Sequence, residues 1–216
     1  MKAILCKSYG TPENLVLEDI EDLKPREGEV LVEVYAASLN FPDTLQIEGK
    51  YQYQPPFPFI PGSEAGGIIK EIGPNVREFD IGDRVMANPG IGAMAELLCV
   101  PFERLRKIPD NMSFNTASGF PMVYTTSYYA LKQRAELKPA ETLLVLGSSG
   151  GVGVTAVELG KLMGAEVIAA ASSEEKLDFV KNIGADYLVN YSDGDLKAKI
   201  KELTNGKGAD VIFDPV

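Results

Sequence analysis

The sequence predicts an α/β protein of two domains, a β-rich domain over residues 1–118 and a domain of alternating strands and helices over residues 119–216. Up to about residue 115, short runs with strand composition alternate with Gly, Pro, Asn and Asp breaks, which indicates a mostly antiparallel barrel or sandwich. From residue 121 onward, apolar runs alternate with segments of helical periodicity. This second pattern indicates parallel βαβ units with right-handed crossovers.

The expected strands of the first domain are short apolar or alternating segments. They cover residues 2–7, 15–19, 29–37, 66–72, 83–87 and 95–100. The chain between them is rich in proline, which fixes φ and removes a backbone donor. We therefore expect a long, stiff, partly extended loop, and long ordered loops often carry function. The prolines concerned are Pro25, Pro42, Pro55, Pro56, Pro58 and Pro61.

The second domain is expected to begin with a helix and then to alternate regularly. The helices are predicted over residues 125–137, 154–164, 173–184 and 195–206, and the strands over residues 143–147, 165–171, 187–190 and 209–214. The strand at 143–147 is apolar on both faces, as a central parallel strand should be.

The composition narrows the functional classes. The chain has 216 residues, 45% of them hydrophobic, and a net charge of −10. This acidic balance argues against nucleic acid or an anionic membrane as a partner, because polyanions attract a basic face. No apolar run approaches the roughly 20 residues of a membrane span and the N-terminus lacks a signal-peptide block, so we expect a cytoplasmic protein. Cys6 and Cys99 are expected as buried, reduced thiols.

The sequence contains no histidine. This absence removes the commonest general acid or base, the commonest catalytic zinc ligand and every Ser–His or Cys–His nucleophile pair. The two cysteines are far apart and form no CxxC motif, so we expect no metal site. The chemistry must then come from a cofactor.

A glycine-rich stretch, GSSGGVG over residues 147–153, follows the central strand and opens a helix. Gly151, Gly153 and Ala156 fit the G-x-G-x-x-G/A dinucleotide pattern. We expect glycine to allow positive φ in the turn and a close approach of the diphosphate, while Ala156 lets the helix pack near the strand. The alternative is a turn that merely connects two elements. The expected cofactor contacts here are Ser148, Ser149, Gly150, Gly151, Val152 and Gly153, with the two serines adding hydroxyl donors.

The end of the second strand indicates which dinucleotide binds. An NAD enzyme usually presents an acidic residue to the ribose about 20 residues after the glycines. Here Ser172 and Ser173 follow the strand and Lys176 lies close behind, which favours the 2′-phosphate of NADPH. Alternatively, this segment is only the capped, charged start of a helix.

These motifs together resemble a known family. GSSGGVG, MVYTTSYYAL, SSEEK and LVNY in the second domain, with SLNFPDTLQIEGKY, PGSEAGGIIKEIGPNV and DIGDRV in the first, look like the zinc-independent quinone oxidoreductase (ζ-crystallin-like) branch of the medium-chain dehydrogenase/reductases. The resemblance implies a GroES-like domain followed by a Rossmann domain, and an NADPH-dependent reductase of quinones or other α,β-unsaturated carbonyls. Ser63 stands where zinc-dependent relatives carry His, and Ser38 where a ligand Cys is expected.

The resemblance also assigns individual residues. Asn40, Asp43 and Tyr51 would line the cleft beside the nicotinamide and the substrate, with Tyr51 or solvent as the proton source. Thr126 would meet the carboxamide or ribose, Ser172 and Lys176 the 2′-phosphate, and Tyr191 the adenosine. Each has a structural alternative: Asn40 and Asp43 as turn formers, Tyr51 and Thr126 as packing or capping residues. Glu64 is expected to be structural.

The last predicted strand is the fourth of a dinucleotide fold that normally has about six. We therefore expect an incomplete Rossmann domain with an exposed sheet edge, consistent with a truncated chain or with a homodimer that covers the edge. Two alternatives stay open. One is an enoyl-thioester reductase of the same fold, and the other is an NADPH-binding fragment without catalysis.

Overall fold

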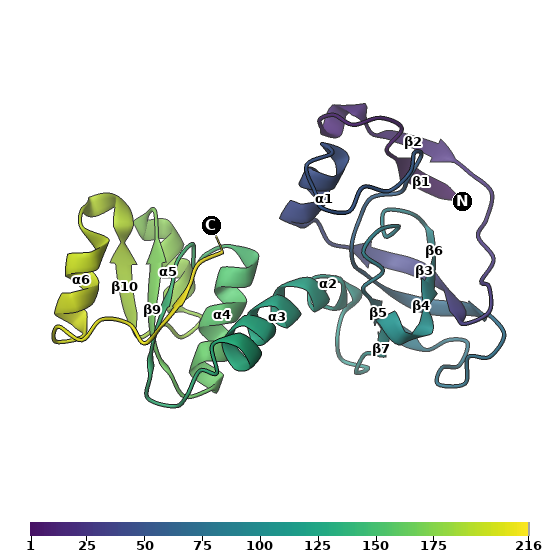
Figure 1. Ribbon diagram of the computed structural model, residues 1–216. Coiled ribbons are helices and arrows are strands. Elements are labelled where there is room, and N and C mark those ends of the chain that lie inside the picture. Colours follow the sequence, from purple (N-terminus) through teal and green to yellow (C-terminus); the bar gives the residue numbers. More distant parts are fainter. Residues whose placement is uncertain (216) are drawn as a thin grey trace. The chain divides into compact units, whose positions relative to one another are not determined.

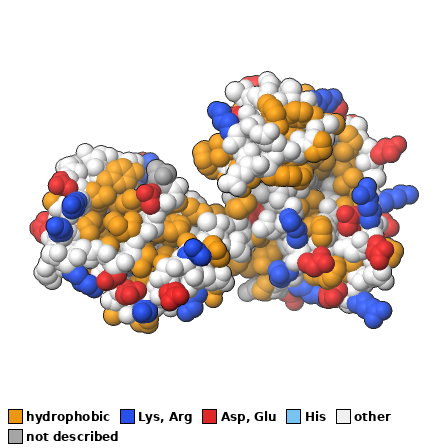
Figure 2. Space-filling view, in the orientation of Figure 1, with side chains coloured by type: hydrophobic (Ala, Val, Ile, Leu, Met, Phe, Trp, Pro, Cys, Tyr) orange, Lys and Arg blue, Asp and Glu red, His pale blue; other side chains and the backbone are white. Residues whose placement is uncertain are grey.

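The computed structural model describes residues 1–215 and divides the chain into two compact units, Met1–Met122 and Val123–Val216 (Figure 1). The division falls a few residues beyond the boundary expected from the sequence. Acidic and basic side chains are interspersed on the visible face of each unit (Figure 2). Within residues 1–215, no helix is long and apolar enough to cross a membrane.

The first unit is built on antiparallel sheets, as predicted. Its main sheet has five strands in the order β6-β3-β4-β5-β7, and a separate pair joins β1 to β2. The strands are β1 (Lys2–Leu5), β2 (Val16–Asp19), β3 (Glu29–Ala37), β4 (Ala65–Ile72), β5 (Arg84–Ala87), β6 (Leu97–Pro101) and β7 (Leu105–Lys107). β7 is the strand that the sequence did not predict.

Alternation along β3 builds the core of this unit. Val30 and Val32 point inward from β3 and are completely buried, opposite Val100 and Leu98 of β6. They join Ile69, Val85 and Leu105 in one apolar cluster. Of the two cysteines, Cys6 is buried and Cys99 half-buried, and both are free thiols. Burial raises the pKa of Cys99 to about 11, so its thiol is protonated at neutral pH.

The proline-rich segment is not loop throughout, and the prediction was wrong over Phe41–Ile47, which form helix α1. Pro42 sits in the first turn, where its missing N–H costs nothing. Asn40 caps the helix, and its backbone N–H donates to the Asp43 carboxylate at 2.8 Å. The capping pair therefore starts a helix that the prolines obscured. The chain from this helix to β4 has no regular element.

The second unit is a four-stranded parallel sheet in the order β10-β9-β8-β11, which confirms the predicted alternation. Its strands are β8 (Thr142–Val145), β9 (Glu166–Ala171), β10 (Tyr187–Asn190) and β11 (Val211–Phe213), and its helices are α4 (Gly151–Leu162), α5 (Glu174–Lys181) and α6 (Leu196–Leu203). The helix expected over 125–137 begins earlier, as α3 (Pro121–Tyr128), and continues as a π-helix, η3 (Tyr129–Arg134). A short helix that was not expected, α2 (Phe114–Ser118), precedes it.

Helices cover both faces of the parallel sheet. Leu143 and Val167 pack toward α4 and α5, whereas Leu144 and Ile168, one residue along each strand, pack toward α6. Both faces are buried, which explains why β8 and β9 are apolar after their first residues. Among the described residues β11 lies at the sheet edge, with Ile212 61% exposed.

Candidate functional site

The turn between β8 and α4 is shaped by one glycine with positive φ. Gly147 has φ +54°, whereas Gly150 is extended (φ −76°, ψ 164°) and caps the helix that begins at Gly151. Gly147 is therefore the residue of this turn whose backbone requires glycine for its positive φ. Gly151 and Gly153, the glycines of the motif, do not have positive φ.

Gly153 is required by packing against this turn. A Cβ on it would lie 2.3 Å from the Gly147 carbonyl oxygen and 2.8 Å from backbone atoms of Ser148. Its missing side chain therefore has a role inside the fold, and the expected close approach of the diphosphate stays a prediction. A Cβ on Gly150 would meet only the Gly147 oxygen, at 3.4 Å, and Gly150 is exposed.

The first turn of α4 presents donors without acceptors. The first helical hydrogen bond runs from the Val154 N–H to the Gly150 carbonyl at 2.8 Å. The N–H groups of Gly151, Val152 and Gly153 have no acceptor within residues 1–215, as expected for the first turn of a helix. These amides, together with the helix dipole, favour an anion at this point. The arrangement fits the diphosphate of a dinucleotide.

The two serines of the turn differ in what they can do. Ser148 is completely buried, and both its hydroxyl and its N–H donate to the Ala170 carbonyl, at 3.0 and 3.1 Å. Its hydroxyl proton is committed to the end of β9, so the expected donation from Ser148 to the cofactor is not supported. Ser149 is half-buried, and its predicted contact stays a prediction.

A buried hydroxyl pair that sequence reasoning missed lies beneath the turn. The Ser127 hydroxyl of α3 donates to the Val152 carbonyl at 2.8 Å and lies 2.8 Å from the Thr155 hydroxyl of α4. Thr155 also reaches the Val123 carbonyl at 3.1 Å. These hydrogen bonds join α3 to the first turn of α4. They therefore help to fix the position of the backbone amides in that turn. Thr126, the predicted contact, is exposed on α3.

The carboxyl ends of β9 and β10 bring three predicted residues into one neighbourhood. The Lys176 ammonium donates to the Ser172 hydroxyl at 2.9 Å. The Ser172 carbonyl accepts from the Ser192 hydroxyl at 3.0 Å, and Tyr191, 37% exposed, is the adjoining residue. Lys176 has no carboxylate partner in the described part of the chain. Ser192, two residues beyond the end of β10, was not predicted from the sequence.

A small cavity in the first unit contains two of the three predicted catalytic residues. It measures about 130 Å³, and Asp43, Tyr51 and Ser63 are among the side chains that line it. Asp43 is 5% exposed, and burial raises the pKa of its carboxyl, assisted by the negative charge of Glu64. Hydrogen bonds from Asn40 and Ser63 oppose this shift in the pKa.

Asn40, the third predicted catalytic residue, contacts a buried carboxylate instead. Its side-chain amide donates to Glu64 at 2.7 Å and to the Ser38 hydroxyl at 3.0 Å. Glu64 is completely buried, and it also accepts from the Ser38 hydroxyl at 2.5 Å and from the Met122 N–H at 2.7 Å. As expected, Glu64 has a structural role, since it ties three separate segments together.

The side chains around Glu64 occupy the position where zinc-dependent relatives are expected to bind the metal, so their chemistry shows whether a zinc ion fits. Two hydroxyls, of Ser38 and Ser63, and one carboxylate, of Glu64, meet here and are hydrogen-bonded among themselves through Asn40. Zinc prefers thiolate and imidazole ligands in this position of a tetrahedral site. In residues 1–215, no three His, Cys, Asp or Glu side chains are grouped so as to hold a metal ion. The donor set does not fit zinc.

Comparisons with known proteins agree with this geometry. Residues 26–110 match the family model of the alcohol dehydrogenase GroES-like domain, and residues 151–216 match that of the zinc-binding dehydrogenases. A solved structure of a probable oxidoreductase from Mycobacterium abscessus is 37% identical with a TM-score of 0.93, and the match covers 100% of this chain and 69% of that one. The chain belongs to the medium-chain dehydrogenase/reductase superfamily. Its first unit is the GroES-like domain and its second the Rossmann domain.

Similar members of the superfamily are quinone oxidoreductases. The chain is 40% identical to a quinone oxidoreductase-like protein 2 homolog of Nematostella vectensis, covering 100% of the chain and 59% of the relative. It is 32% identical to the Escherichia coli quinone oxidoreductase solved with NADPH, with a TM-score of 0.93 over 99% of this chain and 66% of that one. The chain thus spans about 59% to 66% of the length of the curated relatives that it matches.

Proposed function

We propose that this oxidoreductase transfers hydride from NADPH to quinones or other α,β-unsaturated carbonyls without zinc. The observation that carries the proposal is the turn at Gly147–Gly153, which leaves three backbone amides of the helix start without acceptors within residues 1–215. Gly151 is exposed there, Val152 half-buried and Gly153 buried. The NADPH-bound structure of a relative of 32% identity supports the choice of cofactor.

Within the second unit, each part of the dinucleotide has a candidate partner. The amides of Gly151, Val152 and Gly153 would bind the diphosphate. Lys176 and Ser172 would bind the 2′-phosphate, since a cation and a hydroxyl lie 2.9 Å apart there with no competing carboxylate on Lys176. Tyr191 would lie along the adenosine, and Thr126 is assigned to the nicotinamide side. NADPH, when bound, supplies a hydride from C4 of its ring.

Within the first unit, the cavity beside Asp43 would hold the reacting end of the acceptor. Reduction of a quinone or an enone leaves an enolate or phenolate oxygen that takes one proton. Tyr51 or solvent would supply that proton, and Asp43 lines the same cavity. Asn40 would act through Glu64 and the start of α1 as a positioning residue.

The test is NADPH consumption with 1,4-benzoquinone and with an enone, measured on this chain and on a chain extended at its C-terminus to the length of its relatives. NADPH binding is followed separately by fluorescence. Oxidation of NADPH that depends on either acceptor supports the proposal. Binding of NADPH to both chains with no oxidation by either acceptor would instead show a dinucleotide-binding protein.

A further inference from the structure

A second cavity of about 360 Å³ adjoins the one beside Asp43. Tyr53 and Gly90 line both cavities. The Gly90 N–H also donates to the Ser63 carbonyl at 3.2 Å, so the walls of the two cavities are directly bonded. The two cavities therefore share part of their wall within the first unit.

The larger cavity carries one charged side chain, Arg104. Its other lining residues are Tyr53, Pro89, Gly90, Ile91 and Pro101, none of them acidic. Arg104 ends the short helix η2 (Phe102–Arg104), and its carbonyl accepts from the Asn88 N–H at 3.1 Å. The residue that carries the charge is thus fixed to the cavity wall by its backbone.

The guanidinium of Arg104 is oriented but not neutralised. One nitrogen, Nη1, donates to the Pro89 carbonyl at 2.8 Å. No carboxylate pairs with Arg104 anywhere in the described part of the chain, although the protein carries a net charge of −10. An arginine held by one hydrogen bond keeps its remaining donors available in a planar fork, which suits a carboxylate.

We infer that Arg104 binds a carboxylate on the acceptor, so that the preferred acceptors are enones or quinones bearing a carboxylate remote from the reacting carbon. The apolar walls at Ile91 and Pro101 would contact the carbon skeleton between the two ends. This inference rests on the proposed function, since it places the reacting end of the same acceptor beside Asp43.

The test compares two ligands of nearly the same size, one charged and one neutral: benzalacetone with a para-carboxylate and benzalacetone with a para-carboxamide. Calorimetry at low ionic strength gives the dissociation constants, because exposed ion pairs are screened by salt. We expect the carboxylate to bind about fivefold more tightly than the carboxamide. Arg104→Gln should remove the difference between the two dissociation constants, and Arg104→Lys should keep part of it. The carboxamide should bind wild type and both variants with the same dissociation constant.

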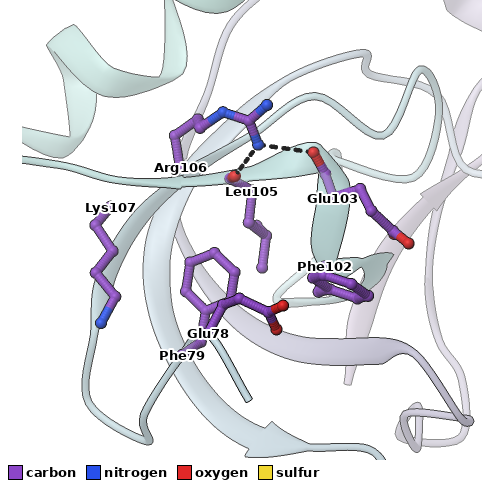
Figure 3. A pocket seen from close by; sticks show the side chains of 7 residues that line it. All are labelled: Glu78, Phe79, Phe102, Glu103, Leu105, Arg106 and Lys107. Atoms are coloured by element: carbon purple, nitrogen blue, oxygen red, sulfur yellow. Dashed lines mark hydrogen bonds between the residues drawn. The ribbon is translucent and has the colours of Figure 1, made fainter. Parts of the chain in front are cut away.

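Arg106→Gln is the matched control. Arg106 lies two residues further along the chain, and its guanidinium also donates to backbone carbonyls, of Glu103 at 2.7 Å and Leu105 at 2.5 Å. It faces a different cavity of about 390 Å³, lined by Phe79, Phe102 and the acidic Glu78 and Glu103 (Figure 3). Its loss should leave the preference for the carboxylate unchanged.

Equal dissociation constants for the two ligands, no measurable binding of either, or a preference that survives in Arg104→Gln would each overturn the inference. The proposed function is judged separately, by NADPH oxidation with the neutral carboxamide. If that ligand is reduced but Arg104 makes no difference, the function stands and the inference fails. If neither ligand is reduced but Arg104 selects the carboxylate, the contact between Arg104 and a carboxylate stands, while the proposed function fails and with it the assignment of that ligand as an acceptor.

Discussion

Replacing Gly153 by Ala tests the packing of the glycine turn. The added Cβ would lie 2.3 Å from the Gly147 carbonyl oxygen, about 1 Å short of ordinary van der Waals contact, and 2.8 Å from the backbone of Ser148. These are backbone atoms, so the start of α4 or the turn itself must shift. Overpacking of this kind costs about 1–3 kcal/mol, whereas the higher helix propensity of Ala returns at most about 1 kcal/mol.

We therefore expect Gly153→Ala to lower the free energy of unfolding by about 1–2 kcal/mol and to weaken NADPH binding, because the three amides move with the turn. Urea unfolding and NADPH fluorescence give the two quantities. Gly150→Ala is the control, since its Cβ would meet nothing closer than 3.4 Å, and it should cost less than about 1 kcal/mol. A Gly153→Ala protein that is more stable than wild type and binds NADPH normally would show that the turn has room for the added Cβ.

Three further predictions concern single side chains. Lys176→Ala should raise the dissociation constant of NADPH about tenfold and leave that of NADH nearly unchanged, and equal losses for both would reject a contact with the 2′-phosphate. Ser148→Ala should lower the free energy of unfolding by only about 0.5–1.5 kcal/mol, because the Ala170 carbonyl keeps its hydrogen bond from the N–H of residue 148. NADPH affinity should change less than twofold. A large loss of affinity would show that Ser148 contacts the cofactor. The pKa of Asp43 is higher in the folded chain than in the unfolded chain, so its contribution to stability is present at low pH and is lost as the pH rises above about 4 through the folded pKa. Urea unfolding of wild type and Asp43→Asn across this range should show wild type losing stability relative to the variant, and a constant difference would contradict the raised pKa.

The parallel half of the fold could be predicted because its signals are local. The strands β8 and β9 are apolar at successive positions, and the glycine turn marks where β8 ends and a helix begins. Helix α1 also had a local signal, the capping residue Asn40 with Asp43 three residues later. That signal was outweighed by Pro42, although proline is well tolerated in the first turn of a helix.

The parts of the site that the sequence did not reveal depend on contacts distant in the chain. The direction of the Ser148 hydroxyl is set by the Ala170 carbonyl, 22 residues further on. Ser127 and Thr155 are 28 residues apart and meet only once α3 packs on α4. The motif located the glycines correctly but not their separate roles, because Gly153 is constrained by a close approach to Gly147 that only the folded turn creates.

The proposed function depends above all on the backbone amides at the start of α4, which we propose hold the diphosphate of the dinucleotide. Heteronuclear NMR of the protein titrated with NADPH tests this contact directly, since each amide reports on its own hydrogen bond. We expect the amides of Gly151, Val152 and Gly153 to show the largest chemical-shift changes and to saturate together with those of Ser172 and Lys176. Saturable NADPH binding that leaves these three amides unmoved would contradict the proposed contact.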